Sequence, residues 1–421
     1  MLNCMKTRIY IFAFALLCTI FTAQSNNYIW LHGLNDDSNC WYIYKNAFTP
    51  SNGDRFYYDS KSGIEKMSSD IWSAKTGYFS SGTILIGHSM GGLIARELEY
   101  NHSGSIKGII TIGTPHQGAP VLGELTNGGA NNLTRKVAGK AKGSVQASVT
   151  AICFTIPGVG FVLPASINLG IDGLYKYVGL PYIDKTLNEE VAKNYGADCS
   201  KDMIPGGTYM NKIASRKVNV PILTFACQED RWQLARLGYC TTNKSTLQTN
   251  TSINTDGSFD MGGYNQLKSL NGTFKTVGGV HAGIAVGCAV GGFFFPYLWA
   301  ASAAHGCASK SWYSTAGYID DGLDFDHAVL LGSYHVDRID TKHRFLWAKW
   351  TTTKYVTVPE PHDGVVGINS QQLDKSKGTN VIWANATIKG VNHMEEFNHP
   401  NTKAEMNKAL KGGYNPVYTN N

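Results

Sequence analysis

The stretch TILIGHSMGGLIAR, residues 83–96, limits more strongly than any other what this chain can fold into. Its first four residues are β-branched or apolar, as in a buried strand, and residues 93–100 have the spacing of a helix. Between them stands Ser89, with Gly87 two residues before it and Gly91 two residues after it. Glycine tolerates backbone crowding that a side chain does not. The pattern predicts a sharp strand-to-helix turn with Ser89 at its tip.

The residues around this turn, 26–118, alternate between strand-like and helix-like segments. Alternation of this kind predicts parallel strands joined by crossover helices that cover both faces of the sheet. Further strands are expected later in the chain, after long interruptions. The expected strands are 28–31, 83–86, 106–112, 220–226, 354–358 and 380–388, and the expected helices are 64–79 and 93–100.

Two irregular regions, at about 119–217 and 231–353, interrupt the strand-and-helix rhythm. Each contains a run without charged residues, at 143–170 and 282–304. We therefore expect one α/β domain over residues 26–421, with a mostly parallel central sheet, helices on both faces and two inserts that form an apolar cap. The run 282–304 is also long enough to be a membrane-span candidate, but its many Ala and Gly residues favour buried cap helices.

The N-terminus has the features of a secretory signal. Lys6 and Arg8 precede an apolar run at residues 9–20, and the small residues at 23–25 suit a signal peptidase. We expect residues 1–25 to be removed and the mature protein to be secreted or otherwise extracytoplasmic, in a periplasm or at a cell surface.

Seven cysteines follow the predicted signal, and an oxidising compartment favours one to three disulfides among them. Cys227 and Cys240 close a short loop and are the first candidates for a pair. The seven are Cys40, Cys153, Cys199, Cys227, Cys240, Cys288 and Cys307.

Composition argues against one class of partner. Hydrophobic residues make up 43% of the chain and charged residues 16%, as in a globular protein with a sizeable core. The net charge of +6 comes from scattered Lys and Arg residues that form no run. We therefore expect no nucleic acid partner.

A serine at the tip of a sharp turn suits nucleophilic chemistry. Its hydroxyl needs a neighbouring base, and the turn lifts it above the strand ends where a substrate can reach it. The backbone N–H of Met90 lies at the start of the following helix, where it can donate to an oxyanion. His32 and Gly33 end the first strand, so the N–H of Leu34 is expected to be the second donor of an oxyanion hole.

Four stretches give the chain a resemblance to secreted α/β-hydrolases of the lipase type, such as bacterial triacylglycerol lipases and the esterases related to GPI-inositol deacylase. The resemblance covers residues 28–118 and 355–400 and leaves the middle of the chain uncovered. It implies an α/β-hydrolase fold and cleavage of carboxylic esters, most of all lipid acyl esters. The stretches are WLHGL at 30–34, IGHSMGGLIAR at 86–96, TIGTPHQG at 111–118 and HDGVVGINSQ at 362–371.

The base is expected to be a histidine on a loop after the last core strand. His393 follows such a strand and Gly390, which makes it the first candidate, and His399 is the alternative. His88 adjoins the nucleophile, but on a sharp turn it should point away from Ser89 and serve in packing.

Two carboxylates compete for the role of the residue that orients the base. Asp363 lies in HDGVVG, which is similar to a pattern of the lipases, and it is the first candidate. Asp230 ends the strand-like segment before the second insert, a usual place for this acid in hydrolases, and is the alternative.

No cofactor is expected for this chemistry, and calcium is a candidate structural ion. In some lipases calcium braces the histidine loop through an aspartate two residues after the histidine, where this chain has Glu395. Four clustered aspartates are a second candidate set of oxygen ligands, although a solvated acidic loop explains them as well. They are Asp320, Asp321, Asp324 and Asp326.

The expected activity is hydrolysis of an ester by Ser89, His393 and Asp363 through an acyl-enzyme. The same three residues serve an acyltransferase, and a catalytically inactive binding protein of this fold is the non-enzymatic alternative. The expected partners are a lipid or other ester substrate and, by interfacial contact, membranes or lipid droplets.

Overall fold

The computed structural model describes residues 26–41, 53–127, 197–230, 262–292, 298–373 and 383–419, with a few single residues between them. The predicted signal peptide and nearly all of the uncharged run 143–170 lie outside the described residues.

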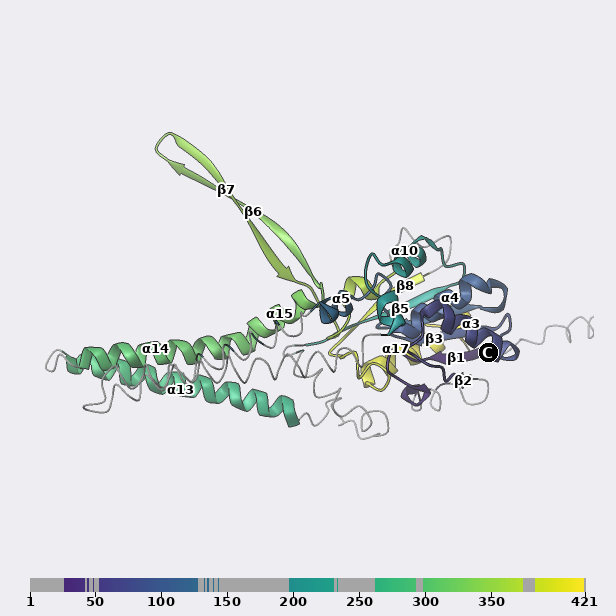
Figure 1. Cartoon of the computed structure of the whole chain (residues 1–421), viewed down its shortest axis with the longest axis horizontal. Coiled ribbons are helices and arrows are strands. Elements are labelled where there is room, and N and C mark those ends of the chain that lie inside the picture. Colours follow the sequence, from purple (N-terminus) through teal and green to yellow (C-terminus); the bar gives the residue numbers. More distant parts are fainter. Residues whose placement is uncertain are drawn as a thin grey trace, which may run out of the picture.

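A six-stranded sheet forms the centre of the domain, and every neighbouring pair of its strands is parallel (Figure 1). The strand order is β2-β1-β3-β4-β5-β8. This arrangement confirms the prediction of a mostly parallel sheet. The strands are β1 (Asn27–Leu31), β2 (Gly53–Arg55), β3 (Thr83–His88), β4 (Gly108–Ile112), β5 (Ile222–Gln228) and β8 (Trp383–Lys389).

Both faces of the sheet are buried, which explains why its strands are continuous apolar runs. Because side chains alternate along a strand, Ile29 and Leu85 pack on one face, while Trp30 and Ile86 pack on the other. Helices α3 (Ile64–Lys75), α4 (Met90–Asn101) and α10 (Thr208–Ser215) contribute to the first core. Helix α17 (Pro400–Leu410) contributes to the second. The expected helices on both faces are therefore present.

The first insert is described only at its two ends. Helix α5 (Pro120–Thr126) follows β4, and helices α9 (Asp198–Asp202) and α10 precede β5. Residues of all three pack into the core on the α4 side of the sheet. These ends of the insert are therefore part of the domain core.

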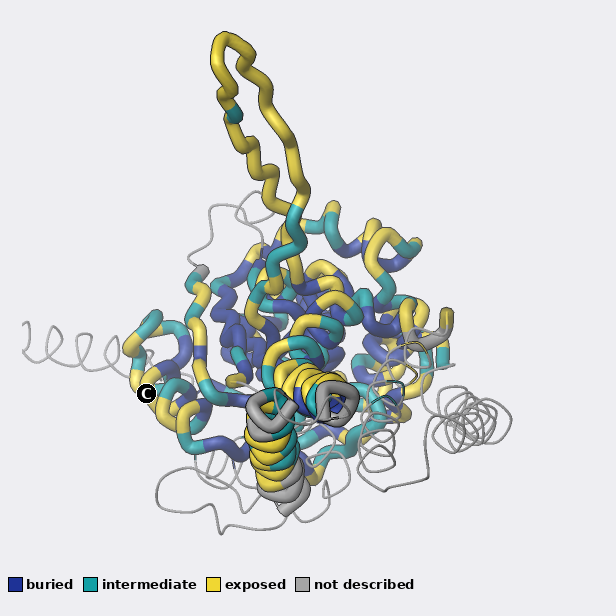
Figure 2. The backbone as a smooth tube through the Cα atoms, turned by 90° about the vertical axis from the view of Figure 1, so that its left-hand side faces the viewer, coloured by how far each residue is buried: buried dark blue, intermediate teal, exposed yellow. Residues whose placement is uncertain are grey.

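The prediction of a core strand at residues 354–358 was wrong. These residues belong to β7 (Ala348–Pro359), which pairs antiparallel with β6 (Tyr334–Phe345) in a separate two-stranded ribbon. The ribbon projects from the body and is exposed along nearly its whole length (Figures 1 and 2). Strand propensity in this segment indicates extended backbone but does not specify a partner, and the neighbouring strand is only a two-residue turn away.

The second insert also contains a hairpin of two long helices, α13 (Gly262–Gly292) and α14 (Leu298–Gly317). They run side by side and extend from the body (Figures 1 and 2). A π-helical turn, η5 (Tyr318–Gly322), and helix α15 (Leu323–Leu330) lead from α14 to β6. At Gly278 an added Cβ would lie 3.2 Å from the ring of Tyr313, so glycine lets the two helices approach closely.

The prediction of buried cap helices was wrong for the described side chains of residues 282–289, whereas Ala304 at the end of the run is buried. None of the described side chains between 281 and 289 is buried, and Val286 is 64% exposed. The many Ala and Gly residues of this run bring little apolar area to bury, which is the physical reason for the error. Within the described residues, no helix is both long and apolar enough to cross a membrane.

The predicted disulfide between Cys227 and Cys240 was also wrong. Cys227 is a free thiol, fully buried in β5, and Cys240 lies outside the described residues. Of the other described cysteines, Cys199, Cys288 and Cys307 are free thiols as well. Sequence separation alone cannot show that a cysteine lies in the core. Because Cys227 is buried in β5, its position there explains why the predicted pair does not form.

Candidate active site

The predicted turn is present between β3 and α4, with Ser89 at its tip. The backbone of Ser89 has φ 52° and ψ −127°, a region that residues with a side chain rarely occupy. A Cβ at Gly87 would lie 2.4 Å from the backbone nitrogen of Gly92, and a Cβ at Gly91 would lie 2.4 Å from the carbonyl oxygen of Leu31. Glycine is therefore required on both sides of the serine because the backbone leaves no room for another residue.

The structure brings Ser89, His393 and Asp363 together from three distant parts of the chain. Oγ of Ser89 lies 3.0 Å from Nε2 of His393, and Nδ1 of His393 lies 2.7 Å from Oδ2 of Asp363. Ser89 directly follows β3, His393 follows β8, and Asp363 lies between β7 and α16 (Ile368–Gln371). In this geometry Ser89 can donate its hydroxyl proton to His393, while the Nδ1–H of His393 donates to Asp363.

Asp363 is held in place from both sides. Its Oδ1 accepts the backbone N–H groups of Val365 at 2.8 Å and Val366 at 2.7 Å, and its backbone oxygen accepts the N–H of His393 at 2.8 Å. The side chain of Gln371 ties the loop to β5 through hydrogen bonds with both backbone groups of Cys227. The carboxylate is therefore fixed beside the end of β5 by a loop that is not part of the sheet.

The alternative candidates lie elsewhere. Asp230 follows β5 and is exposed, whereas Asp363 is fully buried next to the imidazole of His393. His399 is the N-cap of α17, where its Nδ1 accepts the backbone N–H of Asn401 at 3.2 Å. The geometry therefore favours Asp363 over Asp230 and His393 over His399.

Two side chains that sequence reasoning did not place in the site, His88 and Glu396, lie directly behind the base. Nε2 of His88 is 2.9 Å from Oε2 of Glu396, and that oxygen is 3.6 Å from Nδ1 of His393. Nε2 of His88 also lies 3.1 Å from the backbone oxygen of His393. His88 is a packing residue, as expected, but its packing partner is the base. Because the Glu395–Glu396 pair has no distinguishing pattern, the sequence alone could not single out Glu396.

The charges of this cluster act mainly on the base. Burial opposes a positive charge on His393, but the adjacent carboxylates of Asp363 and Glu396 outweigh it and raise the pKa of the imidazole well above its usual value. Burial raises the pKa of Asp363 to about 6 against the attraction of His393. Burial acts on Glu396 too, yet attraction to His393 and His88 lowers its pKa to about 2. The base is therefore expected to become free of its proton only at raised pH.

The predicted oxyanion donors, Leu34 and Met90, belong to two backbone segments next to Ser89. Met90 is the first residue of α4, and the N–H groups of a first helical turn have no acceptor within their helix. Gly33 lies against the nucleophile, because a Cβ there would come within 3.0 Å of Cβ and 3.5 Å of Oγ of Ser89. The segment that carries Leu34 therefore passes beside Ser89, and the roles of the Leu34 and Met90 N–H groups stay predictions.

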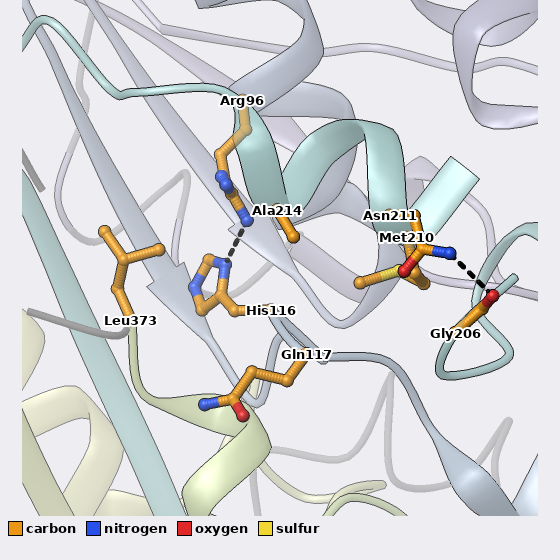
Figure 3. Close-up of a pocket in the computed structure, with 8 residues that line it drawn as sticks. All are labelled: Arg96, His116, Gln117, Gly206, Met210, Asn211, Ala214 and Leu373. Atoms are coloured by element: carbon orange, nitrogen blue, oxygen red, sulfur yellow. Dashed lines mark hydrogen bonds between the residues drawn. The ribbon is translucent and has the colours of Figure 1, made fainter. Parts of the chain in front are cut away.

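Residues 111–118 pack against the turn at Ser89 and the first turn of α4. A Cβ at Gly92 would lie 2.1 Å from Oγ1 of Thr114, so this loop presses on the first turn of α4. His116 bridges Oγ1 of Thr111 at 3.1 Å and the guanidinium of Arg96 at 3.4 Å. Burial, with the help of Arg96, holds the pKa of His116 well below its usual value, so the imidazole is neutral. Figure 3 shows this pair in the wall of a cavity of about 190 Å³.

One group of described residues has metal-ligand geometry, and it overlaps the base. Ligand atoms of His88, His393 and Glu396 all lie within 4.8 Å of one another in the buried site. An ion bound there would compete with Asp363 for Nδ1 of His393. We therefore interpret the group as the hydrogen-bonding surroundings of His393 and not as a metal site.

The calcium ion expected near the histidine loop stays a prediction. Glu395 is fully buried, and its Oε2 accepts the backbone N–H of Asn392 at 3.3 Å, which does not fit an oxygen ligand offered to calcium. In the acidic cluster, Asp320 pairs with Lys275 at 2.7 Å, and Asp326 accepts the hydroxyl of Tyr318 at 2.8 Å. These contacts give two of the four aspartates protein partners.

Comparison with known proteins agrees with the architecture. Residues 68–155 match the family model described as PGAP1-like alpha/beta domain. None of the curated proteins compared with the chain matches it.

Solved structures that align with the chain include several hydrolases. An enol-lactonase from Burkholderia xenovorans is 18% identical over 50% of this chain and 75% of its own, with a TM-score of 0.28. A lipase from Bacillus licheniformis is 11% identical over 54% and 76%, with a TM-score of 0.26. A hydrolase from Oleispira antarctica is 14% identical over 49% and 75%, with a TM-score of 0.27. With its serine turn directly after β3 of a parallel sheet, and with the family match running through that turn, the chain has the α/β-hydrolase fold and contains a region similar to the PGAP1-like domain.

Proposed function

We propose that this protein is a serine hydrolase that cleaves carboxylic esters of lipids through an acyl-enzyme. The observation that carries the proposal is the continuous chain of contacts from Oγ of Ser89 through His393 to Asp363, at 3.0 and 2.7 Å. Serine, base and acid at these distances form the arrangement in which a base removes the hydroxyl proton while a carboxylate orients the base.

In the proposed reaction, Nε2 of His393 takes the hydroxyl proton as Oγ of Ser89 attacks the ester carbonyl. The N–H groups of Met90 and Leu34 stabilise the oxyanion that forms. His393 then gives the proton to the departing alcohol, and the acyl group stays on Ser89. Water next attacks the acyl-enzyme with His393 as base, which releases the carboxylic acid and returns the proton to the serine.

The buried carboxylates support this chemistry electrostatically. Asp363 fixes the tautomer of His393 and stabilises its positive charge while the oxyanion exists. Glu396 adds a second negative charge to the same imidazole, at 3.6 Å from Nδ1. The lipid ester as substrate rests on the resemblance of the four motif stretches to lipases. The secreted or extracytoplasmic location rests on the features of residues 1–25.

The experiment is active-site labelling of the full mature chain with a fluorophosphonate, together with hydrolysis of p-nitrophenyl esters. Ser89→Ala should abolish labelling and lower kcat by about a million-fold, since nucleophile and base act as one unit. Ser103→Ala, at an exposed position after α4, is the matched control and should keep both activities. Labelling that persists in folded Ser89→Ala would refute the proposal, and transfer of the acyl group to an added alcohol in preference to water would identify an acyltransferase instead.

A further inference from the structure

The ribbon of β6 and β7 ends in a tip whose apolar side chains are not covered by the body of the protein. Each strand has 12 residues, which gives the ribbon a reach of roughly 40 Å. At its end Phe345, Leu346 and Trp347 are 68%, 65% and 88% exposed. A soluble surface rarely exposes three large apolar side chains in a row, so this tip indicates an interaction site.

The register of the ribbon separates the side chains near the tip by chemistry. Arg344 lies opposite Lys349, and Lys342 is two residues before Arg344 on the same face, since side chains alternate along a strand. Phe345 and Trp350 lie on the other face, where Trp350 stacks on His343 with the ring centres 5.3 Å apart. The end of the ribbon therefore has a cationic face, an aromatic face and an apolar turn.

On the cationic face the acidic side chain nearest in sequence is Asp340, two residues before Lys342, and none lies closer to the tip. From residue 341 to residue 359 the sequence contains no Asp or Glu. The nearest carboxylate, Asp340, is engaged by Arg338 at 3.1 Å and Thr353. Like charges that face each other across two strands destabilise the pair, so Arg344 and Lys349 are best accommodated when anions lie between them.

We propose that this tip docks the protein on a bilayer that contains anionic lipids. Trp347, Leu346 and Phe345 enter the boundary between headgroups and acyl chains, and the three cations remain at the level of the lipid phosphates and carboxylates. Tryptophan favours this boundary, and basic residues near the surface of an anionic membrane add to the attraction. A narrow projecting tip suits insertion into a soft surface, whereas a protein partner generally needs a broad complementary face.

The proposed docking goes beyond ester hydrolysis and does not depend on it, because Ser89, His393 and Asp363 are not part of the ribbon. Binding can therefore be measured on the mature full chain carrying Ser89→Ala, which cannot degrade the lipids. The assay is sedimentation with vesicles of phosphatidylcholine alone or with about a third of phosphatidylserine. We expect binding to the anionic vesicles that weakens with salt, and weaker binding to the neutral ones.

Two sets of variants test the two parts of the tip. Trp347→Ala should weaken binding about tenfold or more, while Tyr355→Ala, which removes a 67% exposed aromatic ring away from the tip, should leave it unchanged. Replacing three tip cations by glutamine should weaken binding to anionic vesicles by about two powers of ten, at roughly fivefold per charge. The replaced residues are Lys342, Arg344 and Lys349, and the control set is Lys66, Lys201 and Lys212.

Absence of binding to anionic vesicles would overturn the proposal. Equal binding by the tip variants and their controls would overturn it too, since the contact would then lie elsewhere on the protein. Ester hydrolysis of a soluble substrate should persist in all tip variants. Loss of vesicle binding with full hydrolysis therefore supports the docking role, and loss of hydrolysis in Ser89→Ala alone tests the catalytic proposal separately.

Discussion

Glu396→Gln is the substitution that best tests how the buried site sets the protonation of its base. The carboxylate of Glu396 is packed tightly against Gly113, since a Cβ there would lie 2.0 Å from Oε2. Glutamine has the same shape and therefore fits this space. The substitution removes a negative charge 3.6 Å from Nδ1 of His393. At that distance, with an effective dielectric constant of about 20, the pair interaction is about 5 kcal/mol.

Loss of this attraction should therefore lower the pKa of His393. Oε2 of Glu396 also lies 2.9 Å from Nε2 of His88, so only part of its interaction acts on His393. The sign follows from the charge, because a nearby carboxylate favours the protonated imidazole and its removal favours the neutral base.

The assay is kcat/KM for a p-nitrophenyl ester between about pH 5 and 10, because this quantity reports the pKa of the free enzyme. In the unaltered protein activity should rise with pH through an apparent pKa above about 6.5, the usual value for histidine. In Glu396→Gln the rise should occur at lower pH, so the variant should be faster than the parent in acid. Its plateau in alkali should be lower, because the imidazolium formed during the reaction has lost one of its two carboxylates.

The matched control is Glu395→Gln. Glu395 is equally buried, but its carboxylate accepts the backbone N–H of Asn392. Its substitution should leave the apparent pKa in place. An unchanged pH profile in folded Glu396→Gln, or an equal shift in both variants, would refute the reasoning.

Three further predictions follow from the geometry. Asp363→Asn should lower kcat by about 10⁴-fold, while Asp230→Asn should lose far less, and the reverse order in purified variants would identify Asp230 as the acid. Gly91→Ala should lower the free energy of unfolding by about 3 kcal/mol in denaturant titrations, because its Cβ would meet backbone oxygens, whereas Gly104→Ala, which meets nothing within 4 Å, should be tolerated. For a lipid esterase, octanoate esters should exceed acetate esters in kcat/KM by about two powers of ten, and a flat profile over chain length would contradict the proposed substrate class.

The sequence was sufficient to predict those features that depend on interactions between residues close together in the chain. The turn at Ser89 could be predicted because an apolar strand, glycines at fixed spacing and a following helix are encoded within 14 consecutive residues, and the steric need for Gly87 and Gly91 is a property of that backbone. The parallel sheet around it could be predicted because strands buried on both faces are continuous apolar runs.

Pattern and chain order also singled out His393 and Asp363 as first candidates, and the structure brings both to Ser89. Only the tertiary structure distinguishes Asp363 from Asp230. Both lie near the end of β5, but only Asp363 contacts the imidazole of His393.

The sequence pattern predicts the wrong structure where an element's partner, and not its propensity, decides the outcome. Residues 354–358 are strand-like whether they pair in the core or in a ribbon, and the short turn to β6 decided for the ribbon. The uncharged run 282–304 is apolar by composition, but its small side chains left α13 extending from the body, and none of the described side chains from 282 to 289 is buried.

The role of Glu396 depended most fully on tertiary structure. The sequence presents two adjacent glutamates after His393, and only the fold turns one of them toward His88 and the base. Charge interactions act through space over a few ångströms, so residues 88, 363, 393 and 396 form one electrostatic unit that no local pattern of the chain contains. The sequence by itself determined the nucleophile's turn and the class of sheet that supports it; the tertiary structure decided which buried charges surround the base.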